Sequence, residues 1–263
     1  MRFDSVKMLY IVAIAGITFQ LMCSDPSGNS EAVYADNEFR YCNVVGSMIT
    51  PGNEDTVNTW FNTSYLPTIW NYPLLKKVIH YKLDPAIDTL PEYWTFYYYS
   101  TWDEMDTVYE TEAYIDAKKD MDTRWKKGEV SSAVIVNYEK IKGFEKAGAD
   151  VETPFIKVVG NEFVSSQETE LNTWFNTVYI PLLMKYEGLV KVVRYKKNGY
   201  KRKPKLLPTY LTIYYYPDTV AMNGMESSVE YIDAVGKMVA TWNNNELTTI
   251  IIGPCKTLYA AIR

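Results

Sequence analysis

Apolar residues recur at helical spacing in two segments of the chain, 54–67 and 168–181. In each segment they fall at positions i, i+3, i+4 and i+7, so they share one side of a predicted helix. This side is expected to pack against a core. Its members are Val57, Trp60, Phe61 and Ser64 in the first segment, and Leu171, Trp174, Phe175 and Val178 in the second.

The two segments are close copies of each other. They read EDTVNTWFNTSYLP and ETELNTWFNTVYIP, and nine of the fourteen positions are identical at a constant offset of 114. Self-similarity of this kind indicates an internal duplication. Because proline lacks the amide hydrogen that a helix interior needs, we expect Pro67 and Pro181 to end the two helices.

A second stripe on each predicted helix is polar and lies about a third of a turn away from the apolar one. Two interpretations remain open, a solvated flank or a polar face directed at a ligand. The second makes Asn62 and Asn176 candidate ligand-binding residues. The stripe consists of Asn58, Asn62 and Tyr65 in the first copy, and Asn172, Asn176 and Tyr179 in the second.

Runs of aromatic and β-branched residues predict the strands. Together with the helices they give the order β-α-β-β-α-β twice, which is the ferredoxin-like unit. In the first copy the predicted strands are 39–50, 74–83, 92–100 and 131–141, with helices over 54–67 and 107–125. In the second they are 155–164, 188–196, 209–216 and 246–253, with helices over 168–181 and 227–242.

The duplication sets the predicted domain boundaries. Repeat 1 spans 39–142, a linker follows over 143–153, and repeat 2 spans 154–263. The offset between the copies changes from 114 to 117 after the middle hairpin, which places a three-residue insertion in repeat 2. The fold class is α+β, with two tandem ferredoxin-like repeats.

The N-terminus has the pattern of an export signal. Basic residues precede a short apolar run that ends before Cys23, a length typical of a signal peptide rather than a membrane span. We predict a signal peptide over 1–22, lipidation of Cys23, and a flexible tether over 23–38. The protein is then exported and held in the periplasm or cell envelope by a lipid anchor. An uncleaved anchor, or cleavage at another position, is the alternative.

Composition narrows the candidate partners. The chain has 263 residues, 47% of them hydrophobic, 23 tyrosines and a net charge of −5, which argues against a nucleic-acid partner. Cys42 and Cys255 either form a disulfide or remain buried thiols. The spacing of Cys and His predicts no metal site, and we expect no cofactor.

The motif W-F-N-x-x-Y-[LI]-P, followed by a strand with His80-Tyr81 or Arg194-Tyr195, resembles the dimeric α/β-barrel superfamily and within it the EthD-like proteins. The resemblance implies two sheets set face to face around a cavity, here as a dimer made within one chain. The relatives carry histidine where this chain has Tyr65 and Tyr179. Tyrosine is a poor base at neutral pH, so an imidazole mechanism does not carry over.

Strand alternation assigns the residues of the third strands to two faces. Trp94, Phe96 and Tyr98, with their counterparts Leu211, Ile213 and Tyr215, form the more apolar set and are expected under the helices. The other set is then expected to face the cavity between the sheets, where it either binds a ligand or fills the barrel as core. It consists of Thr95, Tyr97, Tyr99, Thr212, Tyr214 and Tyr216.

Three functions follow. The favoured one is a protein that binds a small apolar or aromatic molecule between its sheets. The second is a cofactor-independent monooxygenase or isomerase with His80 as base, Arg194 for charge stabilisation, and Tyr65 or Tyr179 as proton donors. The third is a structural surface component with a filled barrel. The superfamily also includes haem enzymes and ligand sensors, so the fold does not choose among them. An intrachain barrel predicts a monomer or a weak homodimer.

Overall fold

The structure is a computed structural model that describes residues 39–84, 90–147, 155–198, 207–242 and 247–262. All of them belong to one compact unit, Ala32–Arg263. The predicted signal peptide, Cys23 and the tether lie outside the described residues. Among the described helices, none has the length and apolar character needed to cross a membrane.

Both repeats have the predicted element order, and each adds a short helix after its third strand. Repeat 1 contains β1 (Tyr41–Ile49), α1 (Glu54–Trp60), α2 (Leu66–Trp70), β2 (Lys77–Leu83), β3 (Tyr93–Tyr99), α3 (Trp102–Thr107), α4 (Glu112–Lys126) and β4 (Val130–Glu145). Repeat 2 contains β5 (Phe155–Phe163), α5 (Glu168–Trp174), α6 (Ile180–Leu183), β6 (Lys191–Lys197), β7 (Tyr210–Tyr216), α7 (Thr219–Gly224), α8 (Val229–Thr241) and β8 (Leu247–Ile262).

The strands form one closed antiparallel barrel in the order β1-β3-β2-β8-β5-β7-β6-β4. Closure depends on the two long strands. β4 pairs with β1 in its own repeat and then with β6, while β8 pairs with β5 and then with β2. The end of each long strand thereby pairs with a strand of the other repeat, and none of the described barrel strands is left with an open edge. β4 also continues to Glu145, past the predicted start of the linker.

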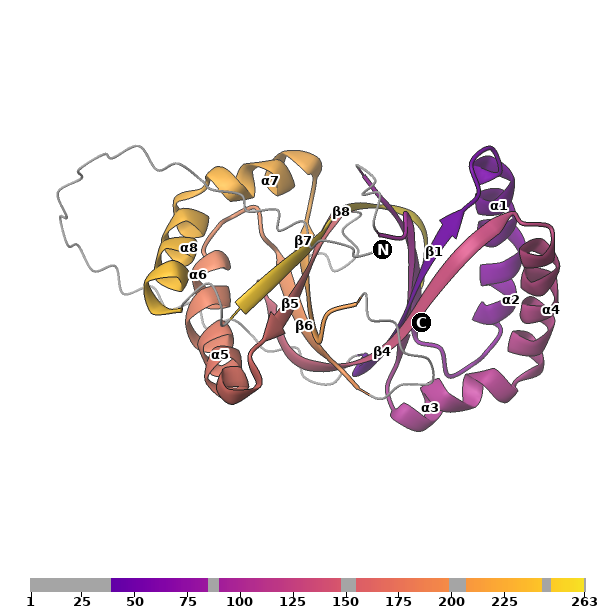
Figure 1. Cartoon of the computed structure of the whole chain (residues 1–263), viewed down its shortest axis with the longest axis horizontal. Coiled ribbons are helices and arrows are strands. Elements are labelled where there is room, and N and C mark those ends of the chain that lie inside the picture. Colours follow the sequence, from indigo (N-terminus) through magenta and orange to yellow (C-terminus); the bar gives the residue numbers. More distant parts are fainter. Residues whose placement is uncertain (1–38, 85–89, 148–154, 199–206, 243–246, 263) are drawn as a thin grey trace, which may run out of the picture. The chain divides into compact units, whose positions relative to one another are not determined.

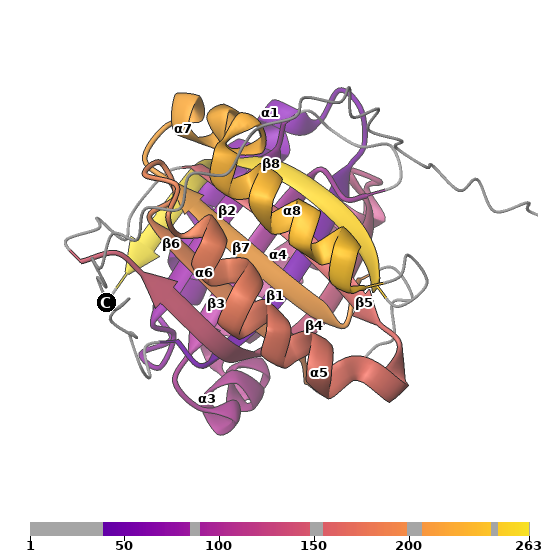
Figure 2. The ribbon, with the colours of Figure 1, turned by 90° about the vertical axis from the view of Figure 1, so that its left-hand side faces the viewer.

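Helices cover the barrel on two sides, one side for each repeat (Figure 1). α1, α2 and α4 lie over the strands of repeat 1, and α5, α6 and α8 lie over those of repeat 2, where Figure 2 shows them in front of the sheet. This arrangement creates a shared interior between the sheets and a separate space under each helix layer.

The prediction for the faces of the third strands is wrong. Trp94 and Phe96 pack with Leu211 and Ile213 of the other repeat, so the more apolar set fills the shared interior. The set Thr95, Tyr97, Tyr99, Thr212, Tyr214 and Tyr216 lies on the opposite face of the strands, and its tyrosines pack with the helices of their own repeat. The sheets of both repeats shield the shared interior from water, which explains why the more apolar residues lie there.

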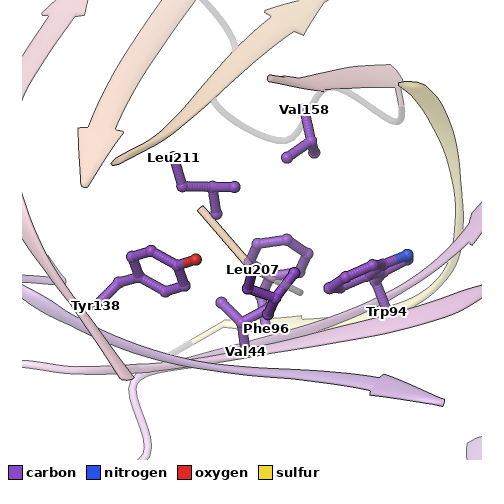
Figure 3. Close-up of a pocket in the computed structure, with 7 residues that line it drawn as sticks. All are labelled: Val44, Trp94, Phe96, Tyr138, Val158, Leu207 and Leu211. Carbon is purple, nitrogen blue, oxygen red and sulfur yellow. The ribbon is translucent and has the colours of Figure 1, made fainter. Parts of the chain in front are cut away.

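The shared interior is packed where the two sheets meet. Side chains from both repeats converge there and leave no space wide enough for a water molecule (Figure 3). The lining residues are Val44, Trp94, Phe96, Tyr138, Val158, Leu207 and Leu211. Cys42 and Cys255 are buried in the same cluster as free thiols rather than as a disulfide. A ligand between the sheets therefore has no room at this place.

A π-helical turn interrupts each duplicated helix, over Phe61–Tyr65 and Phe175–Tyr179. The amide of Leu66 bonds to the carbonyl oxygen of Phe61, five residues earlier, which is the π-helical pattern. The helix then continues through Pro67 to Trp70 in repeat 1, and through Pro181 to Leu183 in repeat 2. The prediction that the prolines end the helices is wrong, because the wider turn accommodates them.

The π turn also changes which side chains point inward. Because the π turn contains one extra residue, the side chains that follow it point in directions that a 3.6-residue period does not predict. Ser64, expected in the core, is exposed, while Leu66 is buried and Tyr65 packs against the core. Both duplicated tyrosines, Tyr65 and Tyr179, are thereby brought beneath the helix layer.

Candidate functional site

The space under the helices of repeat 1 contains a cavity of about 500 Å³. Its floor is the outer face of β1, β3 and β4, and its roof is formed by α2, α4 and the turns beside them. We call it the first cavity. Its lining residues are Asn43, Val45, Ser47, Tyr65, Ile69, Tyr97, Tyr99, Val108, Tyr109, Tyr114, Lys118, Met121, Asp122, Trp125, Val134 and Ile135.

Neutral polar groups line the sheet side of the first cavity. Asn43 donates from Nδ2 to Asn137 Oδ1 at 2.5 Å and to the hydroxyl of Tyr109 at 3.3 Å. Both amides are buried, so their hydrogen bonds are made inside the protein rather than to bulk water. Burial raises the pKa of Tyr109 to about 12, and this phenol stays protonated at neutral pH.

Two further tyrosines connect the first cavity to the strand behind it. The hydroxyl of Tyr97 lies near the side chains of Tyr65 and Thr95. Thr95 Oγ1 lies 2.9 Å from Nδ1 of His80. Burial raises the pKa of both Tyr65 and Tyr97 above the usual value. These hydroxyls therefore stay protonated and can donate hydrogen bonds at neutral pH, but they do not act as bases.

His80 does not line the first cavity. It shares a sheet face with Thr95 and is 3% exposed between the ring of Phe61 and the ring of Tyr93. Its Nε2 lies 3.4 Å from Asn58 Oδ1, so both ring nitrogens have polar neighbours. Desolvation lowers the pKa of His80 to about 3. A neutral imidazole in these surroundings is a weak base, and a metal or haem iron would have to displace a neighbour to reach it.

Arg194 takes the equivalent place in repeat 2 and is fully buried. Its guanidinium donates to Asn176 Oδ1 at 2.5 Å and to Asn172 Oδ1 at 2.9 Å, and it lies over the ring of Phe175. Desolvation lowers the pKa of Arg194 to about 10, so it is still a cation at neutral pH. In repeat 2 the Asn stripe is therefore a polar face directed at Arg194.

A second cavity, of about 200 Å³, lies at the equivalent place in repeat 2. Tyr179, Tyr214 and Tyr216 line it as Tyr65, Tyr97 and Tyr99 line the first. Lys157 replaces Asn43 here and forms an ion pair with Glu226, which replaces Tyr109. The same wall is thus neutral in repeat 1 and charged in repeat 2.

The predicted site residues divide into three groups. Four of the tyrosines on the third strands, with Tyr65 and Tyr179, line the two cavities; they are Tyr97, Tyr99, Tyr214 and Tyr216. Thr95, Thr212, His80, Arg194, Asn62 and Asn176 lie on the same side without lining either cavity. The proposed lipidation residue Cys23 lies outside the described residues.

Sequence reasoning missed the other half of the first cavity. Asn43 lies in a strand and carried no recognisable signal, and Tyr109 was assigned to the helix predicted over 107–125, whereas it lies in the turn between α3 and α4. Tyr114, Met121 and Trp125 were recognisable as one side of the helix predicted over 107–125. Their spacing showed that this side faces inward, but not that it leaves a cavity.

Comparisons with known proteins support the fold. No family model and no curated protein matches the chain. Among solved structures, a "putative monooxygenase" from Fusobacterium nucleatum aligns with a TM-score of 0.59 at 9% identity, covering 86% of this chain and 95% of its own. An anthrone oxidase-like protein aligns with a TM-score of 0.56 at 12% identity, covering 88% and 95%.

A third structure, a "putative monooxygenase" from Lactobacillus acidophilus, aligns with a TM-score of 0.54 at 8% identity and covers 86% of this chain and all of its own. At these identities the likeness concerns the fold alone. Together with the closed eight-strand order, it identifies the architecture: the chain has the dimeric α/β-barrel fold, with both ferredoxin-like units in a single polypeptide.

Proposed function

We propose that the protein binds a small, uncharged, partly aromatic molecule in the first cavity. The observation that carries this proposal is a cavity of about 500 Å³ with hydroxyl and amide groups on its floor and a roof in which apolar side chains lie beside one ion pair. Sites for small molecules usually fall in this size range, with a mostly apolar wall and a few polar groups that orient the ligand. The position differs from the one expected from sequence, because the ligand lies under the helices rather than between the sheets.

The electrostatics of the wall favour an uncharged ligand. The polar groups that reach the floor are neutral, namely the amide of Asn43 and the phenols of Tyr65, Tyr97 and Tyr109. The charged lining residues Lys118 and Asp122 form an ion pair on α4 with half-exposed side chains. A charged ligand would lose its hydration here without gaining a buried counterion.

The test uses N-phenyl-1-naphthylamine, an uncharged fluorescent probe with two aromatic groups. Val45→Phe places a ring into the first cavity, and we expect probe affinity to fall at least tenfold. Val159→Phe makes the equivalent change in the second cavity and serves as the matched control, with affinity near that of the unchanged protein. Equal affinity for the unchanged protein and Val45→Phe would refute the proposal.

A cofactor-independent oxygenase is the second candidate. It is favoured by the neighbouring hydroxyls of Tyr65 and Tyr97 in the first cavity, which could donate hydrogen bonds to the oxygen species that forms as a bound substrate reduces O₂. The fold neighbours named as monooxygenases and as anthrone oxidase-like make anthrone a reasonable first substrate. Oxygen uptake with anthrone should be lost in Tyr97→Phe and kept in Tyr214→Phe. Equal rates in both variants, or no uptake at all, would remove this candidate.

Export and lipid anchoring remain part of the proposal. They are supported by the apolar run before Cys23 and the polar stretch after it. Mass spectrometry of the protein from bacterial membranes should find an N-terminal diacylglyceryl cysteine at position 23. The variant Cys23→Ser should be recovered without lipid, and an unmodified Cys23 in the membrane-bound protein would contradict the anchor.

A further inference from the structure

The two cavities are built from equivalent residues, yet the first has about 500 Å³ and the second about 200 Å³. The tyrosines on the sheet are the same in both, so they do not explain the difference. Three other lining positions carry a bulkier side chain in repeat 2. These pairs are Asn43 and Lys157, Ser47 and Asn161, and Val108 and Met225.

Contacts of its own hold each of the three bulkier side chains in place. Lys157 forms an ion pair with Glu226, although only 17% of the lysine side chain is exposed. Asn161 is buried and donates from Nδ2 to Thr249 Oγ1 at 3.2 Å. Met225 is 3% exposed and packs within the core of repeat 2. None of the three can move out of the second cavity without losing these contacts.

The ion pair has an exact positional counterpart in repeat 1. Asn43 on β1 contacts Tyr109 in the turn before α4, and Lys157 on β5 contacts Glu226 in the turn before α8. The two pairs therefore join equivalent strands to equivalent turns. The neutral pair leaves hydrogen-bonding groups on the floor of the first cavity. The charged pair instead uses the lysine side chain as part of the wall, and desolvating its ammonium further to admit an apolar ligand would be unfavourable.

From these contacts we infer that Lys157, Asn161 and Met225 restrict the chain to one full-size ligand site, by closing the cavity of repeat 2 to the uncharged aromatic ligand that the first cavity takes. This inference rests on the proposed function and adds to it the residues that determine which repeat binds. The three residues act by occupying volume and by replacing a neutral wall with a charged one.

The experiment measures how many molecules of N-phenyl-1-naphthylamine bind per chain in the full-length protein, by equilibrium dialysis. The unchanged protein should bind one. The open variant, Lys157→Asn with Asn161→Ser and Met225→Val, should bind two, because its second cavity then carries the residues of the first. The closed variant, Ser47→Asn with Val108→Met, should lose the first site, with at least a tenfold fall in affinity.

The outcomes separate this inference from the proposed function. One molecule bound by both the unchanged protein and a folded open variant would refute the inference and leave the proposed function standing. Two molecules bound by the unchanged protein would also refute it. No binding by the unchanged protein would refute both. The closed variant has the same N-terminal segment, so it also measures probe bound elsewhere on the chain, and it keeps the inference testable if the open variant does not fold.

Discussion

Asn176→Ala should destabilise the protein strongly, whereas the same change at Asn62 should have little effect. The two residues occupy equivalent positions in the duplicated helix. Asn176 Oδ1 accepts a hydrogen bond of 2.5 Å from the guanidinium of Arg194. Asn62 Oδ1 is buried without a hydrogen-bond partner among the described residues. The duplication thus supplies a matched control within the same molecule.

The size of the difference follows from what each change leaves behind. Asn176→Ala removes a hydrogen bond to a buried cation, which contributes about 1.5–3 kcal/mol, and leaves a charged donor less well satisfied. Arg194 Nη1 then retains only the carbonyl oxygen of Asn172, at 3.5 Å. We expect a loss of about 2–4 kcal/mol. Asn62→Ala removes an acceptor whose burial is already uncompensated, so the free energy of unfolding should change by less than about 1 kcal/mol.

Urea unfolding followed by circular dichroism measures both values, provided that the slope with urea concentration is the same in the variants and the unchanged protein. A Tyr65 or Tyr179 substitution is unsuitable for this comparison because it would also open a cavity. Equal losses for Asn176→Ala and Asn62→Ala would refute the reasoning, since they would show that the buried guanidinium gains nothing from its amide partner.

Two further predictions concern acid stability and close packing. His80 is the only histidine, and its pKa is about 3 in the folded protein against 6.5 in the unfolded chain. Between these two values the unfolded chain binds a proton that the folded protein does not. The free energy of unfolding should therefore fall as the pH drops from 6.5 toward 3. The difference between these two pKa values sets a ceiling of about 5 kcal/mol on the loss. His80→Gln should flatten the profile between pH 4.5 and 6.5, and an unchanged slope would contradict a neutral buried imidazole. Gly160→Ala should lower the stability measured by thermal unfolding by about 1–3 kcal/mol, because the new methyl group would collide with Pro208. Gly236→Ala, on the open side of α8, should raise the stability by up to about 1 kcal/mol. Similar effects at both glycines would contradict the close approach of Gly160 to Pro208.

The duplication and the element order could be read from the sequence because they depend on local patterns. Aromatic and β-branched runs form strands, and helical spacing of Trp60 and Phe61 forms a helix, whatever surrounds them. These are properties of short segments, which a single sequence contains in full.

The face assignment failed because it required knowledge of what lies on each side of the sheet. Every residue of β3 is buried, so the usual alternation of buried and exposed positions is absent. The prediction then relied on relative apolarity alone, and it placed the more apolar residues on the wrong face of the sheet. The prediction that each duplicated helix ends at its proline failed for a related reason. A 3.6-residue period cannot reveal a turn with an extra residue, although the proline two positions after Tyr65 was a hint that the helix is irregular there.

The duplication holds a partial signal for the faces of the third strands. Tyr97 and Tyr99 pack under their own helix layer and are identical to Tyr214 and Tyr216. Residues facing the shared interior must fill a single space together, so a large side chain from one repeat can be balanced by a smaller one from the other.

Trp94 and Phe96 meet Leu211 and Ile213 in this way, and Tyr138 is matched by Cys255. Other pairs in the same interior cluster are identical, namely Val44 and Val158, Tyr81 and Tyr195, and Tyr98 and Tyr215, so divergence in size alone does not separate the two faces. The changes at Asn43, Ser47 and Val108 lie on the helix side, so they are not needed for the two repeats to fit together. They are free to serve binding, and we propose that the difference between the two cavities determines which repeat binds the ligand.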